Sequence, residues 1–453
     1  MCLTDAFAIM MEKVGGKHML LIKNGYIVDP ASGKEGKQDI LIDEENGRIL
    51  RMGDRTKWHM DASDPEPATV YDADGLTVAP GLIDTHVHFR DPGFTYKEDI
   101  ASGSLAAAAG GVTSVILMAN TKPVVDSEET LRYVLEKGRN TGIRVESCCA
   151  VTKGLQGKEL TDMTGLLRAG AVGFTDDGIP ILSEEMTEQA MEQACRCGAV
   201  LSFHEENPAY IHNNGINAGK ASEYYGIGGS PREAEITMVK RDLKLAEKTG
   251  ATICIQHISA RESVDLVRQA KNRGVSVHAE ATPHHFTLTE EAAIRYGTLA
   301  KMNPPLREEA DRLAIIEGLK DGTIDIIATD HAPHSREEKD KPVTEAPSGI
   351  IGLETLLSLG ITSLVKTGQL TLMELLGKMT CNPARLYDLD RGSLTEGAVA
   401  DLVLFDPEKE YEVKGFASRS CNSPFLGWKL TGKVITTICN GKIIYDIRQA
   451  GKE

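Results

Sequence analysis

Histidines recur in this 453-residue sequence at points where short apolar runs end. One run closes with His86 and His88, and two later runs close with His204 and His257. Residues two apart on a β-strand point to the same face, so His86 and His88 would project together. Neutral imidazoles are common ligands of zinc and similar metals. A lone histidine is more often a buried, hydrogen-bonded residue than a ligand, but the recurrence at several run ends favours a metal site.

Aspartates close two further runs of the same kind. Asp176 and Asp177 precede Gly178, and Asp330 precedes the stretch HAPH. An Asp pair before a glycine is by default a solvated turn or a helix cap. Together with four histidines, however, two carboxylates exceed the needs of one tetrahedral zinc and suit two metals about 3.5–4 Å apart. Such metals generate a hydroxide at neutral pH, and one carboxylate, with Asp330 as the best candidate, would move the protons.

The runs that carry these residues alternate with helical stretches. Eight runs are expected to be strands, at residues 82–88, 113–118, 144–151, 171–175, 200–204, 251–257, 275–279 and 324–329. Helical patterns lie between them, at residues 97–109, 127–137, 183–195, 231–249, 260–273 and 311–320. This alternation predicts an α/β fold with a (β/α)8 TIM-like barrel, in which chemistry lies at the carboxyl ends of the strands. An open parallel sheet gives the same pattern and is the alternative.

The two ends of the chain have a different, β-rich pattern, with short strands and Asn-Gly or Asp-Gly turns. We therefore predict that both ends build one small β-sandwich domain beside the barrel. The predicted segments are a poorly ordered extension at 1–18, the first part of the β domain at 19–78, the barrel at 79–390 and the second part of the β domain at 391–453.

The composition excludes several classes of protein. Lys and Arg total 50 against 66 Asp and Glu, and the net charge of −16 disfavours nucleic acid as a partner. The nine cysteines are odd in number and irregularly spaced, which fits reduced thiols better than a disulfide framework. The N-terminus lacks the basic start of a signal peptide, and Gly110 and Gly111 break the longest uncharged run. We expect a soluble cytoplasmic protein with no membrane contact.

Seven motifs give the chain a resemblance to a known family. They are HVHFRDPG at 86–93, ANTKP at 119–123, GFTDDG at 173–178, QHIS at 256–259, MNPPLR at 302–307, ATDHAPH at 328–334 and GIIGLE at 349–354. Over residues 19–446 the sequence resembles the metal-dependent amidohydrolases, and within them the bacterial type of the dihydroorotase family. The arginine after His-x-His-Phe and the Asp-Asp-Gly turn make the resemblance specific, because they are not general features of the superfamily.

The resemblance implies a metal centre. The implied ligands are His86, His88, Asp177, His204, His257 and Asp330. The first two histidines would hold one metal and the other two the second, and the spacing to His204 favours Asp177 over Asp176 as the shared ligand. The expected cofactor is zinc, one or two ions per subunit, with two favoured and bridged by Asp177 and a hydroxide. No lysine ends the fourth strand, so the carboxylated lysine that bridges the metals of many amidohydrolases is not expected.

The resemblance also implies a substrate and a reaction. Arg90, Asn120 and His334 would hold a substrate carboxylate, which suits the planar fork of an arginine, and Asn303 would contact a pyrimidine ring. The implied reaction interconverts L-dihydroorotate and N-carbamoyl-L-aspartate in de novo pyrimidine (UMP) biosynthesis, with a metal-bound hydroxide as nucleophile and Asp330 as general acid and base. The expected partner is this small anionic pyrimidine, the expected assembly is a homodimer, and association with another enzyme of the pathway is a further expectation.

Two alternatives to this function remain at the level of sequence. A related cyclic amidase would act on the neutral rings of hydantoin, dihydropyrimidine or allantoin, and Arg90 with Asn120 argues against it. A non-catalytic relative would serve as a scaffold for another pyrimidine enzyme, and the complete set of metal-ligand residues argues against that.

Overall fold

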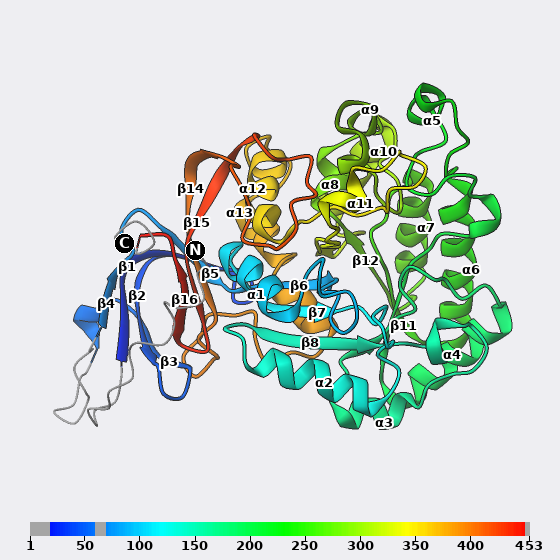
Figure 1. The fold of residues 1–453 in the computed structure, drawn as a ribbon. Coiled ribbons are helices and arrows are strands. Elements are labelled where there is room, and N and C mark those ends of the chain that lie inside the picture. Colours follow the sequence, from blue (N-terminus) through cyan, green and yellow to red (C-terminus); the bar gives the residue numbers. More distant parts are fainter. Residues whose placement is uncertain (1–18, 59–68, 449–453) are drawn as a thin grey trace.

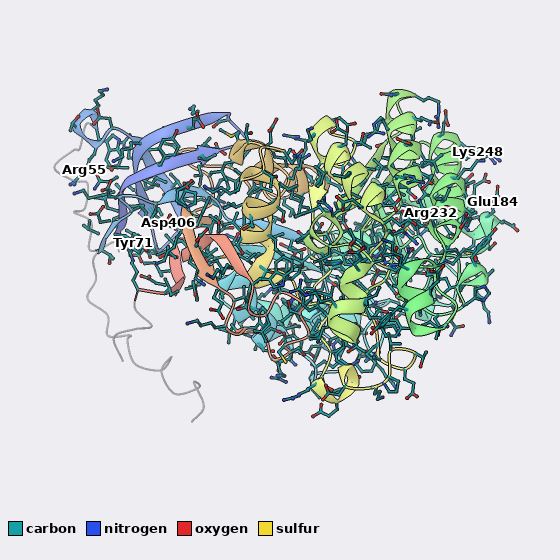
Figure 2. All side chains as sticks on the ribbon, turned by 90° about the horizontal axis from the view of Figure 1, so that it is seen from above. Arg55, Tyr71, Glu184, Arg232, Lys248 and Asp406 are labelled. Atoms are coloured by element: carbon teal, nitrogen blue, oxygen red, sulfur yellow. The ribbon has the colours of Figure 1, made fainter. Side chains whose placement is uncertain are left out.

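The computed structural model describes residues 19–58 and 69–448, so the predicted extension at 1–18 lies outside the described residues. The chain forms an α/β barrel with a β-sheet beside it (Figure 1). Seen from above, Tyr71 and Asp406 lie on the side of the sheet, and Glu184, Arg232 and Lys248 lie on the side of the barrel (Figure 2). In the described parts of the chain, no helix is long and apolar enough to cross a membrane.

Eight parallel strands in sequence order form the barrel. They are β6 (Leu82–Val87), β7 (Val112–Leu117), β8 (Arg144–Cys149), β9 (Gly173–Phe174), β10 (Val200–Phe203), β11 (Thr252–Ile255), β12 (Val277–Ala281) and β13 (Ile326–Ile327). A parallel bridge between Val87 and His331 joins the last strand to the first, and the His88 N–H donates to the His331 carbonyl at 2.9 Å. The sheet therefore closes, which confirms the barrel and excludes the open sheet.

Helices surround the barrel (Figure 1). In chain order, the helices are α1 (Ile100–Ala109), α2 (Glu128–Arg139), α3 (Met163–Ala169), α4 (Glu184–Cys197), α5 (Lys220–Tyr225), α6 (Glu233–Thr249), α7 (Arg261–Asn272), α8 (Pro283–Thr287), α9 (Glu291–Tyr296), α10 (Glu309–Asp321), α11 (Arg336–Lys339), α12 (Leu356–Gly360), α13 (Leu372–Gly377) and α14 (Cys381–Leu386). The longer ones, such as α2, α4, α6 and α7, cover the outer face of the barrel. In α7 the buried residues Val264, Val267 and Ala270 repeat every three residues, so one face packs on the barrel. The side chains of Ser127 and Ser183 cap the N-termini of α2 and α4. These are the residues at which the two helical stretches were predicted to begin.

The strands from the two chain ends form one further eight-stranded sheet. They are β1 (Met19–Asp29), β2 (Lys34–Asp43), β3 (Arg48–Gly53), β4 (Thr69–Asp72), β5 (Thr77–Pro80), β14 (Leu402–Glu412), β15 (Lys429–Cys439) and β16 (Lys442–Asp446). β14 pairs antiparallel with β5, so the end of the chain joins its beginning. Val403, Phe405 and Val434 from this sheet belong to the same hydrophobic cluster as the barrel, and Thr437 donates to the Ala108 carbonyl of α1 at 2.7 Å. The sheet therefore packs directly against the outside of the barrel.

Candidate active site

The predicted metal ligands lie together at the carboxyl ends of the barrel strands. His86 belongs to β6, and the others follow the ends of strands β6, β9, β10, β11 and β13 within three residues; they are His88, Asp177, His204, His257 and Asp330. All six are buried, with at most 7% of their surface exposed. Because every strand of a parallel barrel ends at the same rim, residues up to 244 positions apart meet there.

Asp177 lies at the centre of this cluster. One of its oxygens, Oδ1, is 3.5 Å from His86 Nε2, 3.6 Å from His204 Nδ1 and 3.9 Å from His257 Nε2. The other, Oδ2, is 3.5 Å from His88 Nε2. The neighbouring Asp176 instead accepts hydrogen bonds from the backbone N–H groups of residues 151 and 152. Asp177 is therefore the aspartate of this pair that faces both histidine pairs.

Asp330 closes the cluster on the side of the first histidine pair. Its Oδ1 lies 3.0 Å from His88 Nε2 and 3.5 Å from His86 Nε2. Burial would raise the pKa of Asp330, but the charge of His86 and the hydrogen bond from His88 lower it to about 2. The pKa of Asp177 likewise lies well below its ordinary value. Burial would raise this pKa, but hydrogen bonds from His204, His257 and His86 outweigh that effect. Both groups are thus carboxylates at neutral pH.

The ring nitrogens that face the centre of the cluster are the ones that a bound metal would use. His86 places Nδ1 3.2 Å from Glu280, and His204 places Nε2 3.2 Å from Glu206, so these nitrogens carry the hydrogens. Against the effect of burial, the neighbouring carboxylates raise the pKa of His86 well above its ordinary value and that of His204 to about 10, so the opposite nitrogens also carry hydrogens in the ligand-free protein. A bound metal would replace those hydrogens and take the lone pairs. His204 Nδ1 lies only 2.9 Å from His257 Nε2. The cluster contains three overlapping groups of three residues, and within each group the imidazole nitrogens and carboxylate oxygens lie within 4.8 Å of one another. Such groups fit a divalent cation of the zinc type.

Two buried glutamates behind the histidines were not predicted from the sequence. Glu280 on β12 accepts hydrogen bonds from His86 and from the Thr85 hydroxyl, the latter at 2.7 Å. Glu206 accepts from His204 and from the Ser230 hydroxyl. Such carboxylates fix the tautomer and direction of a metal-binding histidine. The sequence did contain a signal for Glu206, because it follows the predicted ligand His204 by two residues. Glu280 was missed because the seventh strand was predicted to end at residue 279.

A cavity of about 190 Å³ opens onto the cluster and is lined by the predicted substrate residues Arg90, Asn120, Asn303 and His334. The Arg90 Nη2 lies 3.5 Å from His334 Nε2, so two nitrogen groups converge on one side of the cavity. Asn303 Oδ1 is buried without a hydrogen-bond partner among the described residues. A buried polar atom of this kind that faces a cavity is suited to a polar ligand.

Asn120 connects the cavity to the metal-ligand cluster. Its Oδ1 lies 3.0 Å from His88 Nδ1, and its Nδ2 donates to Asp177 Oδ2 at 2.9 Å. A hydrogen on Nδ1 directed at this contact would let Nε2, which lies beside Asp330, serve as the ligand atom of His88 when a metal is bound. The structure thus shows Asn120 orienting two predicted ligands in addition to lining the cavity.

The comparisons with known proteins agree with this geometry. The model of the amidohydrolase family matches residues 77–444. A dihydroorotase of Clostridioides difficile (strain 630) is 55% identical over 428 residues, which cover 94% of this chain and 100% of that protein. The chain belongs to the dihydroorotase family. A dihydroorotase of Lactococcus lactis is 50% identical and is likewise covered completely, with 95% of this chain matched.

Solved structures extend the likeness of this dihydroorotase-family chain to the whole fold. An L-hydantoinase (dihydropyrimidinase) from Arthrobacter aurescens has a TM-score of 0.83 at 26% identity, over 95% of this chain and 96% of that one. A D-hydantoinase (dihydropyrimidinase) from Thermus sp. has a TM-score of 0.79 at 27% identity, with 94% of each chain covered. The barrel with its adjoining sheet is therefore an architecture that proteins with other named activities share, so the cavity must decide the substrate.

Proposed function

We propose that this protein is a dihydroorotase, which reversibly hydrolyses L-dihydroorotate to N-carbamoyl-L-aspartate in pyrimidine biosynthesis. One observation carries the proposal: the cavity joins a buried cluster of metal-ligand residues to Arg90, a guanidinium suited to a carboxylate. The chain's family membership and its 55% identity to a dihydroorotase support the same reaction.

In the proposed mechanism, the first and second histidine pairs would hold zinc, with two ions favoured, and Asp177, which faces both pairs, would be a further ligand. When bound, the metal would supply Lewis acidity and bring the pKa of a water molecule toward neutrality. Arg90, His334 and Asn120 orient the ring through its carboxylate, and Asn303 contacts the ring itself. This positioning directs the scissile carbonyl at the metal-ligand cluster.

Asp330 moves the proton in the proposed reaction. It is a carboxylate at neutral pH and therefore accepts a proton from the attacking water. A bond then forms between the water oxygen and the carbonyl carbon, the bond from that carbon to the ring nitrogen breaks, and Asp330 gives its proton to the departing nitrogen. The same steps in reverse close the ring.

A hydantoinase activity is the second candidate, because solved hydantoinases share the fold. Hydantoin and allantoin carry no ring carboxylate, and they would leave the partly buried guanidinium of Arg90 without a carboxylate partner in the cavity. Burial of an unpaired charge is costly, so the cavity favours the carboxylated substrate.

The test is a comparison of substrates with purified, metal-loaded protein. Hydrolysis of dihydroorotate is followed by ultraviolet absorbance, with hydantoin and allantoin as parallel substrates. Turnover of dihydroorotate alone supports the proposal, and turnover of the neutral rings instead supports a hydantoinase. If no ring is hydrolysed although metal is bound, the chain is a non-catalytic relative. The homodimer, the association with another pathway enzyme and the cytoplasmic location stay predictions.

A further inference from the structure

His334 lies between two cationic side chains at the edge of the cavity. Its ring Nε2 is 2.9 Å from the carbonyl oxygen of Ser348, and its Nδ1 is 3.3 Å from Lys97 Nζ. Arg90 Nη2 lies on the Nε2 side at 3.5 Å. Only 6% of the His334 side chain and 12% of the Lys97 side chain are exposed, so water does not readily replace these partners.

These two contacts select the same tautomer of the imidazole. A carbonyl oxygen only accepts hydrogen bonds, so Nε2 must carry the hydrogen toward Ser348. An ammonium group only donates, so Nδ1 must offer its lone pair to Lys97. Burial and the charges of Arg90, Lys97 and Lys339 lower the pKa of His334 far below its ordinary value, which keeps the ring neutral.

Glu338 does not compete effectively for the His334 ring. Its Oε1 accepts from Lys97 at 2.9 Å and from the Tyr96 hydroxyl at 3.0 Å, and its Oε2 accepts from the Ser335 N–H at 3.0 Å. Oε2 is 3.4 Å from His334 Nδ1, which is longer than the contacts to its other donors. The carboxylate thus holds Lys97 in place while Lys97 faces the ring.

The selected tautomer turns this side of the cavity into a pair of donors. The Nε2–H of His334 and the Nη2 of Arg90 cannot bond to each other. The Nε2–H donates to the Ser348 carbonyl, and a carboxylate bound beside it would share that hydrogen and accept a second one from Arg90. A carboxylate offers two acceptor oxygens, and hydrogen bonds to a charged group are stronger than neutral ones. The opposite tautomer would point a lone pair at the same carboxylate and repel it.

We propose that Lys97 is a positioning residue, which fixes His334 as the Nε2–H tautomer and so makes this side of the cavity select a carboxylated substrate. Lys97 contacts His334 from behind and is not among the residues that line the cavity. The identity of the carboxylated substrate rests on the proposed function, whereas the tautomer is a property of the ligand-free protein.

The tautomer is tested by nitrogen NMR of ligand-free protein labelled with ¹⁵N-histidine, with His334 assigned through the loss of its signals in His334→Gln. We expect a neutral Nε2–H ring in the wild type and a loss of that single tautomer in Lys97→Met. Lys97→Arg, which still donates to Nδ1, should restore it. An Nδ1–H or charged ring in the wild type, or an unchanged ring in Lys97→Met, overturns the proposal.

The consequence for binding is tested by kinetics with dihydroorotate. Lys97→Met should raise KM by about tenfold, the effect of one lost charged hydrogen bond, and leave kcat within about a factor of two. Tyr96→Phe is the matched control, because it removes a bond to Glu338 without touching His334. If Tyr96→Phe raises KM equally, the effect is a general loosening and the proposal is wrong. If the wild type does not hydrolyse dihydroorotate, the proposed function fails, while the NMR result still decides the tautomer.

Discussion

Glu280→Gln should weaken metal binding by about tenfold. The glutamate is buried and accepts one hydrogen bond from His86 at 3.2 Å and one from Thr85 at 2.7 Å. Glutamine keeps the shape and one acceptor oxygen but loses the charge. A hydrogen bond to a charged group contributes about 1.5–3 kcal/mol and a neutral one about 0.5–1.5 kcal/mol. The difference, about 1.4 kcal/mol, corresponds to a factor of ten in affinity, within the 10–100-fold range for such partners of metal-binding histidines.

The assay is a zinc titration of metal-stripped protein in competition with a chromophoric chelator. Glu290→Gln is the matched control. Glu290 is also buried and accepts two hydrogen bonds, from Asn217 Nδ2 and the Ala221 N–H, and neither partner is a predicted ligand. We expect the control to bind zinc as the wild type does.

Two results would refute this reasoning. If Glu280→Gln binds zinc with wild-type affinity, the carboxylate does not determine the basicity or direction of His86. If Glu290→Gln weakens binding to the same extent, the loss reflects a general loosening of the fold and not the contact with His86.

Three further predictions concern catalysis, substrate binding and stability. Asp330→Asn should retain zinc, as measured by metal analysis, yet lose turnover by about 10²–10⁴-fold, the usual contribution of a general acid and base; a wild-type rate would contradict its role. Arg90→Met should raise the KM for dihydroorotate by about tenfold or more, and unchanged kinetics would exclude the carboxylate contact. Glu354 accepts N–H bonds from Ala417 and Ser418, and burial raises its pKa from 4.5 to about 7. The folded state therefore holds its proton more tightly, so this group stabilises the fold at low pH and the contribution is lost as the pH rises from 4.5 to about 7. Urea unfolding at pH 5 and pH 7.5 should show that Glu354→Gln lacks this part of the pH dependence, and an identical dependence in both proteins would contradict it.

The sequence permitted a detailed prediction of the fold because the barrel's pattern is local. Each barrel strand is part of a short apolar run, and helices such as α2 and α4 have a buried apolar face and a serine cap, at Ser127 and Ser183. Errors occurred where the local pattern is weak. The seventh strand spans Val277–Ala281 and not 275–279, because its partner strands β11 and β13 decide which residues pair. The helix α3 was not predicted, since it is only seven residues long.

The sequence by itself also determined which residues stand at the strand ends, and hence the chemistry available there. Only the tertiary structure decided how these residues are used. Barrel closure brings His88 within 3.0 Å of Asp330, and strand pairing brings Glu280 behind His86. The ring nitrogen that carries the hydrogen in each histidine depends on partners such as these, which are far away in the chain. Residue type is a local property that a sequence contains, whereas hydrogen-bond direction is set by neighbours that meet only when the barrel closes.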